Sequence, residues 1–292
     1  EHAFAERENI RIVQPKGLYK TFHSTWRTAG ISKYAKQDNV KLFHGLSGEL
    51  PMGLTKQNIR SVVTIHDLIF LRSPEFYKPA ARIIYKKKFR TACNHADLII
   101  AISKQTKDDI ISYFGVNENK IRLVYQGCNP QFYNCCSEEE KKNVSLKYKL
   151  PGKYILYVGT IEERKNFNTI VRALASMPKD IHLVAIGRST KYMGKVKAEI
   201  NRLKLSERVK FIHKSDFCDL PAIYQQAQVF VLPSVFEGFG IPVLEALNSK
   251  IPVITSNVSS LPEAGGPHSL YINPTDSKEL EKTLFELFAH PE

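Results

Sequence analysis

The sequence predicts an α/β protein of two Rossmann-like domains in tandem, each built on a doubly wound parallel sheet. Its 292 residues, 43% of them hydrophobic, are enough for two ordinary domains with separate cores. Short apolar runs alternate with helical or loop segments along the chain, a pattern typical of parallel sheets covered by helices. The chain-breaking pair Pro151-Gly152 follows a polar, charge-rich stretch and indicates an interdomain connection. We therefore expect domains at residues 1–150 and 151–292.

The first domain is expected to contain four strands, each ending in polar or glycine residues. They lie at residues 39–45, 62–71, 97–103 and 121–127. Residues 72–92 hold seven basic residues and one acid, and their apolar residues recur at near-helical spacing: Ile83, Ile84, Tyr85, Phe89 and Ala92. This segment predicts a basic amphipathic helix.

In the second domain the same alternation is more regular. Strands are expected at residues 154–159, 182–187, 209–213, 229–234 and 252–256. Helices are expected near residues 167–176, 192–203, 218–227 and 242–249. Ligands of doubly wound sheets bind outside the carboxyl ends of the strands, so two such domains facing each other form a cleft there.

The formal charge of +13 is concentrated in the first domain. Residues 1–150 hold 25 Lys and Arg against 14 Asp and Glu, whereas residues 151–292 hold 17 against 15. The basic helix is therefore either an ordinary solvated face or a surface for anionic lipid or nucleic acid. Aromatic-rich RNA-reading signatures are absent, which argues against nucleic acid and leaves a solvated face and an anionic membrane surface as the two alternatives.

Cysteine usage favours a cytoplasmic protein, and the basic helix adds the possibility that it is peripheral on the inner face of the membrane. Five cysteines, an odd number with no C-x-x-C spacing, argue against a disulfide framework and a zinc site. No run approaches the roughly 18 apolar residues that span a bilayer. The opening "EHAFAERENIRIV" carries no secretion signal.

Candidate ligand-binding residues follow the first strand of the second domain. In "TIEERKN", Arg164 and Lys165 come directly before a helix that Asn166 is expected to cap. Cations beside the free amides of a helix start favour phosphate. This segment therefore predicts a phosphate site.

A second candidate segment, "VFEGFGIP", follows the fourth strand of this domain. Gly238 and Gly240 let backbone N–H groups approach a ligand closely, and Pro242 suits the first turn of the next helix. Glu237 is expected in the glycine loop and Glu245 in the first turn of that helix, where the macrodipole favours a carboxylate. A carboxylate can accept a hydrogen bond from each hydroxyl of a vicinal diol, so Glu245 suits a ribose and Glu237 a sugar. Either glutamate alone is more commonly a solvated acid, but together with the basic pair the two indicate function.

Motifs for other nucleotide sites are incomplete. "GFGIPV" supplies only the first two glycines of G-x-G-x-x-G, and no G-x-x-x-x-G-K-[ST] occurs. No D-x-D pair is present to hold a divalent metal on a diphosphate, so Lys, Arg and backbone amides are expected to neutralise it. We expect a site that needs neither a metal ion nor a cofactor.

These segments resemble a known family. "VFVLPSVFEGFGIPVLEAL" resembles the E-x7-E signature of the retaining glycosyltransferases of family 4, and "YVGTIEERKNFNTIVRAL" resembles their phosphate-binding R-K-N segment. "LFHGLSGELP", "VVTIHDLIFL" and "ADLIIAISKQTKDDIISYFGVNENKIRLVYQG" resemble the acceptor-side domain of bacterial members that build surface polysaccharides. The resemblance covers nearly the whole chain and implies the GT-B architecture, in which the second domain binds most of the nucleotide-sugar.

The resemblance also implies roles for individual residues. Glu245 would hold the ribose, Glu237 the transferred hexose, and Lys165 with Arg164 the diphosphate. His66, in "TIHD", matches the family's active-site histidine, although a strand-end histidine bonded to Asp67 or to backbone is the open alternative. The expected donor-binding set is Arg164, Lys165, Glu237, Gly238, Phe239, Gly240, Ile241 and Glu245, with backbone N–H groups of Phe239 and Gly240 facing the diphosphate or the sugar. The expected catalytic set is His66, Glu237 and Lys165.

Four features depart from the family pattern. Thr160 stands where many members carry a phosphate-binding arginine, so one phosphate ligand is either missing or supplied by Arg164. His213-Lys214 stands where relatives often have glycine, which leaves the nucleotide base open. The family's first strand with its glycine-rich acceptor loop, and the helix that crosses back to the first domain, have no counterpart, so both ends are expected to be truncated.

The resemblance implies transfer of a hexosyl group from a nucleoside-diphosphate sugar to a hydroxyl of a lipid-linked saccharide, with retention at the anomeric carbon. No residue pattern places a carboxylate nucleophile below the sugar, so a front-face mechanism is favoured over double displacement. Two other classes stay open. A nucleotide-sugar epimerase of similar fold would turn over the donor without an acceptor, and a non-catalytic sugar-nucleotide-binding protein would bind without turnover.

Overall fold

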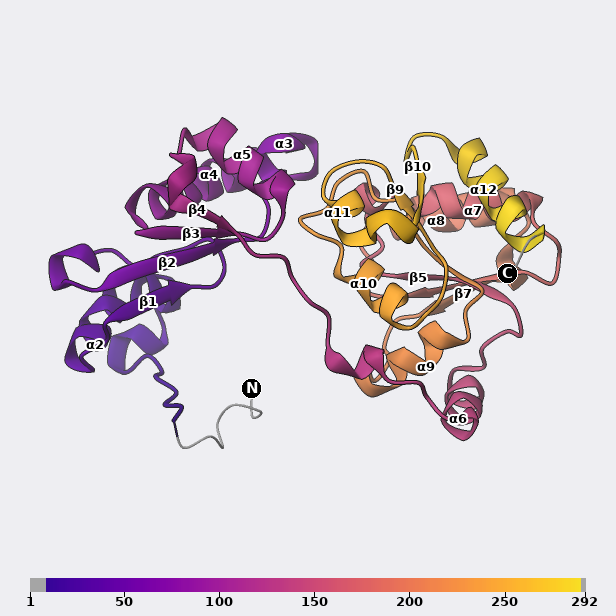
Figure 1. Cartoon of the computed structure of the whole chain (residues 1–292), viewed down its shortest axis with the longest axis horizontal. Coiled ribbons are helices and arrows are strands. Elements are labelled where there is room, and N and C mark those ends of the chain that lie inside the picture. Colours follow the sequence, from indigo (N-terminus) through magenta and orange to yellow (C-terminus); the bar gives the residue numbers. More distant parts are fainter. Residues whose placement is uncertain (1–8, 290–292) are drawn as a thin grey trace.

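The computed structural model describes residues 9–289, which form two lobes, each around its own parallel sheet (Figure 1). In the first lobe the strands lie in the order β1-β2-β3-β4, and every pair is parallel. The strands are β1 (Leu42–Gly45), β2 (Arg60–Ile65), β3 (Leu98–Ala101) and β4 (Ile121–Leu123). The helices are α1 (His23–Thr25), α2 (Ile31–Gln37), α3 (Ile69–Arg72), α4 (Pro79–His95) and α5 (Lys104–Phe114).

Strand β2 is shorter than predicted. It ends at Ile65, and the apolar residues that follow it form α3 instead of extending the strand to residue 71. Apolar residues at the end of a buried strand do not show by periodicity alone whether the chain continues as strand or turns into helix. The earlier end leaves His66 and Asp67 at the carboxyl edge of the sheet.

The second lobe contains the larger sheet, in the order β10-β9-β8-β5-β6-β7, again with all pairs parallel. Its strands are β5 (Tyr154–Val158), β6 (His182–Ile186), β7 (Val209–Ile212), β8 (Val229–Leu232), β9 (Val253–Ser256) and β10 (Leu270–Ile272). The first five are the strands that the sequence predicts, and β10 is one that it does not. The helices are α7 (Phe167–Ser176), α8 (Met193–Arg202), α9 (Leu220–Gln225), α10 (Ile241–Asn248), α11 (Leu261–Gly265) and α12 (Ser277–Ala289).

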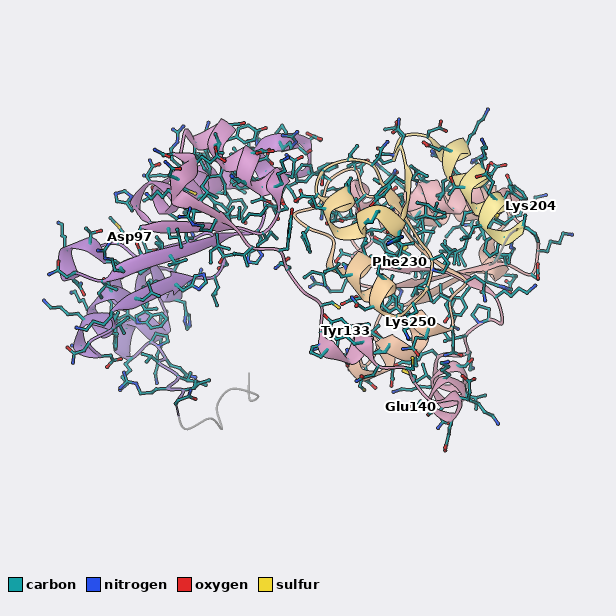
Figure 2. The ribbon with its side chains drawn as sticks, in the orientation of Figure 1. Asp97, Tyr133, Glu140, Lys204, Phe230 and Lys250 are labelled. Atoms are coloured by element: carbon teal, nitrogen blue, oxygen red, sulfur yellow. The ribbon has the colours of Figure 1, made fainter. Side chains whose placement is uncertain are left out.

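Each lobe has its own core. Strands β5 and β8 are buried along nearly their whole length, as expected of central strands with helices on both faces. Phe230, in the middle of β8, is fully buried, whereas Lys204 and Glu140 lie on the surface (Figure 2). The apolar core of each lobe therefore fixes the position of the strand ends that carry the candidate residues.

After β4 the chain crosses to the second lobe as an extended segment, visible in Figure 1 between β4 and α6 (Glu138–Tyr148). Helix α6 begins with a capping box made by Ser137 and Glu140 and packs on α9. Phe132, just before it, lies edge-to-face against Tyr224 of α9, with ring centroids 5.5 Å apart. The domain boundary at residue 150 stays a prediction.

The two lobes also meet directly. The Glu263 carboxylate, on α11, accepts hydrogen bonds from the backbone N–H groups of Lys104 (2.6 Å) and Gln105 (3.0 Å) at the start of α5. Phe239 of the second lobe stacks on Tyr125 of the crossing segment, with centroids 5.7 Å apart. A carboxylate at a helix N-terminus satisfies amides that have no partner within the helix and is favoured by the macrodipole, so this contact joins the lobes at a defined point.

Candidate functional site

The order of strands in the second sheet locates the candidate site. From β5 the chain adds β6 and β7 on one side and then returns to add β8, β9 and β10 on the other. The loops after β5 and β8 therefore diverge at the switch point, where doubly wound sheets bind ligands. Arg164 and Lys165 lie in the first of these loops, and Glu237 lies in the second.

Glu237 joins the two loops through a buried ion pair. Lys165 Nζ donates to Glu237 Oε1 at 2.5 Å, and Arg164 Nη1 lies 3.1 Å from Glu237 Oε2. The three side chains are 13%, 14% and 10% exposed for Lys165, Arg164 and Glu237. Burial raises the pKa of Glu237, but the two cations and a 2.7 Å hydrogen bond from Ser234 outweigh burial and hold that pKa below its ordinary value. Glu237 is therefore an ionised carboxylate between two cations.

The backbone of the glycine loop is held by two serines after β9. Ser259 Oγ accepts from the Glu237 N–H at 2.9 Å and donates to the Glu237 carbonyl at 2.9 Å. Ser260 Oγ donates to the carbonyls of Glu237 and Phe239. The loop ends at Gly240, whose φ of 114° is strained for other residues, and α10 begins at the next residue. The N–H groups of Phe239, Gly240 and Ile241 thus stand at the start of α10, where no intrahelical acceptor exists.

Glu245 lies in α10, but not in its first turn as the sequence predicts. The helix starts at Ile241, so Glu245 is its fifth residue, and α10 has no acid in its first turn. The side chain is buried and accepts a 2.8 Å hydrogen bond from Tyr224 Oη on α9. Burial raises the pKa of Glu245, and the bond from Tyr224 offsets this only in part. The carboxylate therefore has one protein donor and is costly to keep charged.

Asn166 does not cap α7 with its side chain. It is in the left-handed region (φ 54°, ψ 38°), no cap hydrogen bond forms, and its side-chain amide donates to the Pro274 carbonyl. Because a left-handed residue turns the chain sharply, Asn166 fixes the angle between the Arg164-Lys165 segment and the helix. Arg164 also donates from Nη2 to Glu162 and from Nη1 to the Phe236 carbonyl, so both terminal nitrogens of its guanidinium are held by the second lobe.

His66 faces the glycine loop from the first lobe. A Cβ added to Gly238 would lie 2.5 Å from the His66 carbonyl oxygen and 3.1 Å from Asp67 Cβ, so the absence of a side chain at Gly238 allows the two loops to meet. The His66 ring is exposed, and its Nε2 lies 2.8 Å from the Leu46 carbonyl. The structure therefore brings His66 close to the loop of Glu237, with the ring bonded to backbone.

Four residues of this arrangement escape the sequence reasoning. They are Tyr224, Ser234, Ser259 and Ser260, which hold Glu245, Glu237 or the loop between them. The two serines after β9 could be found by applying the strand-end rule to the fifth predicted strand, whereas no local pattern marks Tyr224. Asp67 is a further neighbour of this arrangement. Burial raises the pKa of its carboxyl group, and the hydrogen bond from the Ile69 N–H and the charge of Arg164 offset this only in part.

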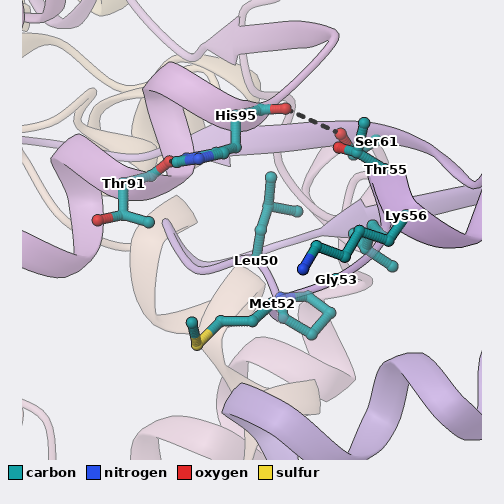
Figure 3. A pocket seen from close by; sticks show the side chains of 10 residues that line it. Leu50, Met52, Gly53, Thr55, Lys56, Ser61, Thr91 and His95 are labelled. Carbon is teal, nitrogen blue, oxygen red and sulfur yellow. Dashed lines mark hydrogen bonds between the residues drawn. The ribbon is translucent and has the colours of Figure 1, made fainter.

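A separate cavity of about 240 Å³ lies in the first lobe and contains none of these residues (Figure 3). It is formed by the segment at residues 50–56, by Ser61 and by Thr91 and His95 of α4. Among residues 9–289 no group of three or more His, Cys, Asp or Glu side chains could hold a metal ion. In the same part of the chain no helix combines the length and apolar character needed to cross a bilayer.

Two family profiles match the chain and together cover nearly all of it. The profile "Glycosyl transferases group 1" matches residues 137–292, and "Glycosyltransferase Family 4" matches residues 2–132. O-antigen chain mannosyltransferase B of Escherichia coli is 32% identical over 283 residues, covering 94% of this chain and 70% of the relative. O-antigen chain mannosyltransferase RfbU of Salmonella typhimurium is 28% identical over 224 residues, covering 76% and 59%.

Solved structures agree on the fold. The Anabaena protein Alr3699/HepE, in complex with UDP and glucose, superposes with a TM-score of 0.76 at 18% identity, covering 95% of this chain and 75% of that chain. The two parallel sheets are thus those of the GT-B fold, as the sequence predicts. The chain belongs to the group 1, family 4 glycosyltransferases.

Proposed function

We propose that this chain transfers a hexosyl group from a nucleoside-diphosphate sugar to a saccharide hydroxyl with retention of configuration and without a metal ion. The observation that carries the proposal is the Glu237 carboxylate, buried between Lys165 and Arg164 at the switch point and faced by the His66 segment. Cations fixed in place before the donor binds stabilise charge on the departing diphosphate at no cost of reorganisation. Glu245, with one protein donor, is free to accept from a ribose diol.

The chemistry is a front-face substitution. The bond from the anomeric carbon to the diphosphate oxygen breaks, the acceptor oxygen bonds to that carbon on the same face, and its proton passes to the departing diphosphate. Lys165 and Arg164 neutralise the diphosphate, and Glu237 orients the hexose through its hydroxyls. His66 lies on the acceptor side of the transferred sugar. Closure of the two lobes around the donor would exclude water, which would otherwise hydrolyse the donor.

Mannose is the hexose that the relatives favour, because both O-antigen enzymes named above are mannosyltransferases. The relatives do not decide the nucleotide base of the donor, because the structural relative named above is in complex with UDP and the mannosyltransferase names do not state a nucleotide. Calorimetric titration with GDP-mannose, UDP-glucose, UDP-galactose and UDP-GlcNAc tests both points. We expect GDP-mannose to bind most tightly and to be the donor that is turned over with a mannoside acceptor. Failure to bind any of the four donors would refute the proposed function.

The need for a metal is tested separately. Since cationic side chains and helix-start amides can neutralise a diphosphate, we expect EDTA to leave transfer nearly unchanged. A strict requirement for Mg²⁺ or Mn²⁺ would contradict the role of the Lys165-Arg164 pair.

We also propose that the acceptor is lipid-linked and that α4 docks on an anionic membrane at the cytoplasmic face. Ile83 and Ile84 are 71% and 54% exposed, and Lys86 and Lys87 lie beside them on the helix surface. Exposed apolar side chains among lysines suit the boundary between headgroups and acyl chains. Lys88 is different, because it pairs with Glu49 at 2.8 Å and is held to the first lobe.

A further inference from the structure

One contact between the lobes lies on the glycine loop itself. Arg72, the last residue of α3 in the first lobe, places its guanidinium carbon 5.7 Å from the centroid of the Phe236 ring in the second lobe. The ring is buried, and the carbonyl of Phe236 accepts a hydrogen bond from Arg164. A guanidinium over an aromatic face is attracted by the ring, and the attraction grows when water is excluded. Both lobes therefore hold the residue that directly precedes Glu237.

Successive residues of this loop face opposite lobes. Phe236 meets Arg72, and Gly238 meets the His66 segment of the first lobe. Glu237, between them, turns to the second lobe, where it pairs with the two cations of the loop after β5. The position of the Glu237 carboxylate thus depends on two neighbours that the first lobe contacts.

Helix α5 supports both of these contacts from the first lobe. Asp109 Oδ1 accepts from Arg72 Nη1 at 2.8 Å and from Gln105 Nε2 at 3.0 Å. One turn earlier on the same face, Thr106 Oγ1 donates to the His66 carbonyl at 3.2 Å. The start of the same helix is where the second lobe docks through α11. A single helix therefore relates the docking of the lobes to the positions of Arg72 and His66.

The pair of Arg72 and Asp109 is costly for the first lobe alone. Asp109 is 2% exposed, and its Oδ2 accepts no hydrogen bond within residues 9–289. Burial raises the pKa of this carboxyl group, and Arg72 and Gln105 offset this only in part. Apolar residues of similar volume often stabilise a core as well as a buried ion pair does, or better. The pair thus indicates a role beyond the core of its own lobe, and the contact with Phe236 supplies one.

We infer that Arg72, held by Asp109, is a positioning residue for transfer, which sets the glycine loop through Phe236 so that Glu237 stands against the hexose. The inference rests on the proposed function and adds a residue outside the donor-binding set. Because Arg72 acts through Phe236, its loss should lower the rate of transfer and leave the affinity for a nucleoside diphosphate unchanged.

Hydrogen exchange of the loop amides tests the contact independently of activity. The N–H groups of Val235 and Glu237 are hydrogen-bonded within the second lobe, so their exchange reports opening of the loop. Arg72→Ala is made in the background of Asp109→Asn, so that no buried carboxylate is left without its cation. We expect exchange of these amides, measured by mass spectrometry on loop peptides, to be about fivefold faster than in Asp109→Asn alone.

Arg60→Ala in the background of Asp97→Asn is the matched control. These two residues also form an ion pair in the first lobe, at 3.2 Å. Arg60 is the first residue of β2, at the end of that strand away from His66. Exchange of the loop amides should therefore be the same as in the parent.

Transfer from GDP-mannose to methyl α-D-mannoside, together with calorimetry on GDP and UDP, tests the role. We expect the loss of Arg72 from the Asp109→Asn background to lower kcat about fivefold and to change diphosphate affinity by less than about twofold. The inference is overturned if loop exchange or kcat is unchanged, or if diphosphate affinity falls as much as kcat. A parent chain that transfers from none of the four donors named above rejects the proposed function together with the role in transfer. Intact transfer with unchanged loop exchange rejects the inference alone.

Discussion

Replacing Glu237 with Gln tests the buried ion pair at the switch point. The change keeps the shape of the side chain but leaves Lys165 and Arg164, which are 13% and 14% exposed, without their carboxylate. Breaking a buried pair on one side costs about 3–5 kcal/mol, out of a total stability of about 5–15 kcal/mol. For a domain of this size that cost corresponds to a melting temperature roughly 6–20 °C lower. The variant is therefore expected to fold but to melt well below the parent.

A nucleoside diphosphate should reverse much of this loss. In the proposed complex the two cations are shared between Glu237 and the diphosphate, whereas in Glu237→Gln the diphosphate is the main anion for Lys165 and shares Arg164 with Glu162. A ligand at one hundred times its dissociation constant stabilises the native state by about 2.7 kcal/mol. We expect the rise in melting temperature on adding the diphosphate to be at least as large in the variant as in the parent. Transfer should be lost, because the variant lacks the carboxylate that we propose orients the hexose.

Thermal melts with and without GDP and UDP provide the assay, and Glu199→Gln provides the control. Glu199 also pairs with two arginines, Arg172 at 2.7 Å and Arg202 at 2.8 Å, but these are 53% and 63% exposed. Exposed pairs contribute about 0–1 kcal/mol, so this variant should melt within a few degrees of the parent. The reasoning is refuted if Glu237→Gln melts like the parent or if the diphosphate stabilises it less.

Three further predictions concern other parts of the structure. Burial raises the pKa of Glu245, so above that pKa the charged carboxylate lowers the stability of the folded protein. Glu245→Gln should therefore melt at a higher temperature than the parent at pH 8. The difference in melting temperature should shrink as the pH falls through the raised pKa and vanish below about pH 4. The same variant should bind both diphosphate and nucleotide-sugar about tenfold or more weakly, and equal melting at pH 8 would contradict this account. Gly238→Ala places a methyl group against the His66 carbonyl, so steady-state kinetics should show a fall in kcat while calorimetry shows unchanged diphosphate binding. Replacing both Lys86 and Lys87 with Gln should weaken binding to anionic vesicles, measured by co-sedimentation, by about 2 kcal/mol, while the affinity for the donor stays unchanged. The same substitution of two exposed lysines on the second lobe should leave vesicle binding unchanged.

The sequence predicts those parts of the fold that depend on periodicity. Nine strands are apolar runs bounded by turn residues, and the structure contains all nine. Strand β10 is missed because its apolar run contains only Leu270, Tyr271 and Ile272, whereas the equally short β4 lies within the longer run at residues 121–127. The end of β2 is missed because α3 continues its apolar character.

The sequence predicts which residues form the candidate site better than it predicts how those residues are arranged. The placement of Glu245 is wrong by one residue, because α10 begins at Ile241, directly after Gly240, and not at Pro242. The side-chain cap at Asn166 is wrong because a left-handed residue turns its amide towards Pro274. The bond from Tyr224 spans 21 residues and depends on how α9 packs on α10, which no local pattern reports.

The contact of Glu263 with the start of α5 has a consequence for how such a protein can diverge. The carboxylate binds the N–H groups of Lys104 and Gln105, which are main-chain atoms that every residue except proline provides. Side chains on that face of the first lobe can be exchanged without altering the atoms that Glu263 recognises. The side chains on that face of the first lobe can thus change over generations while its docking on the second lobe stays the same.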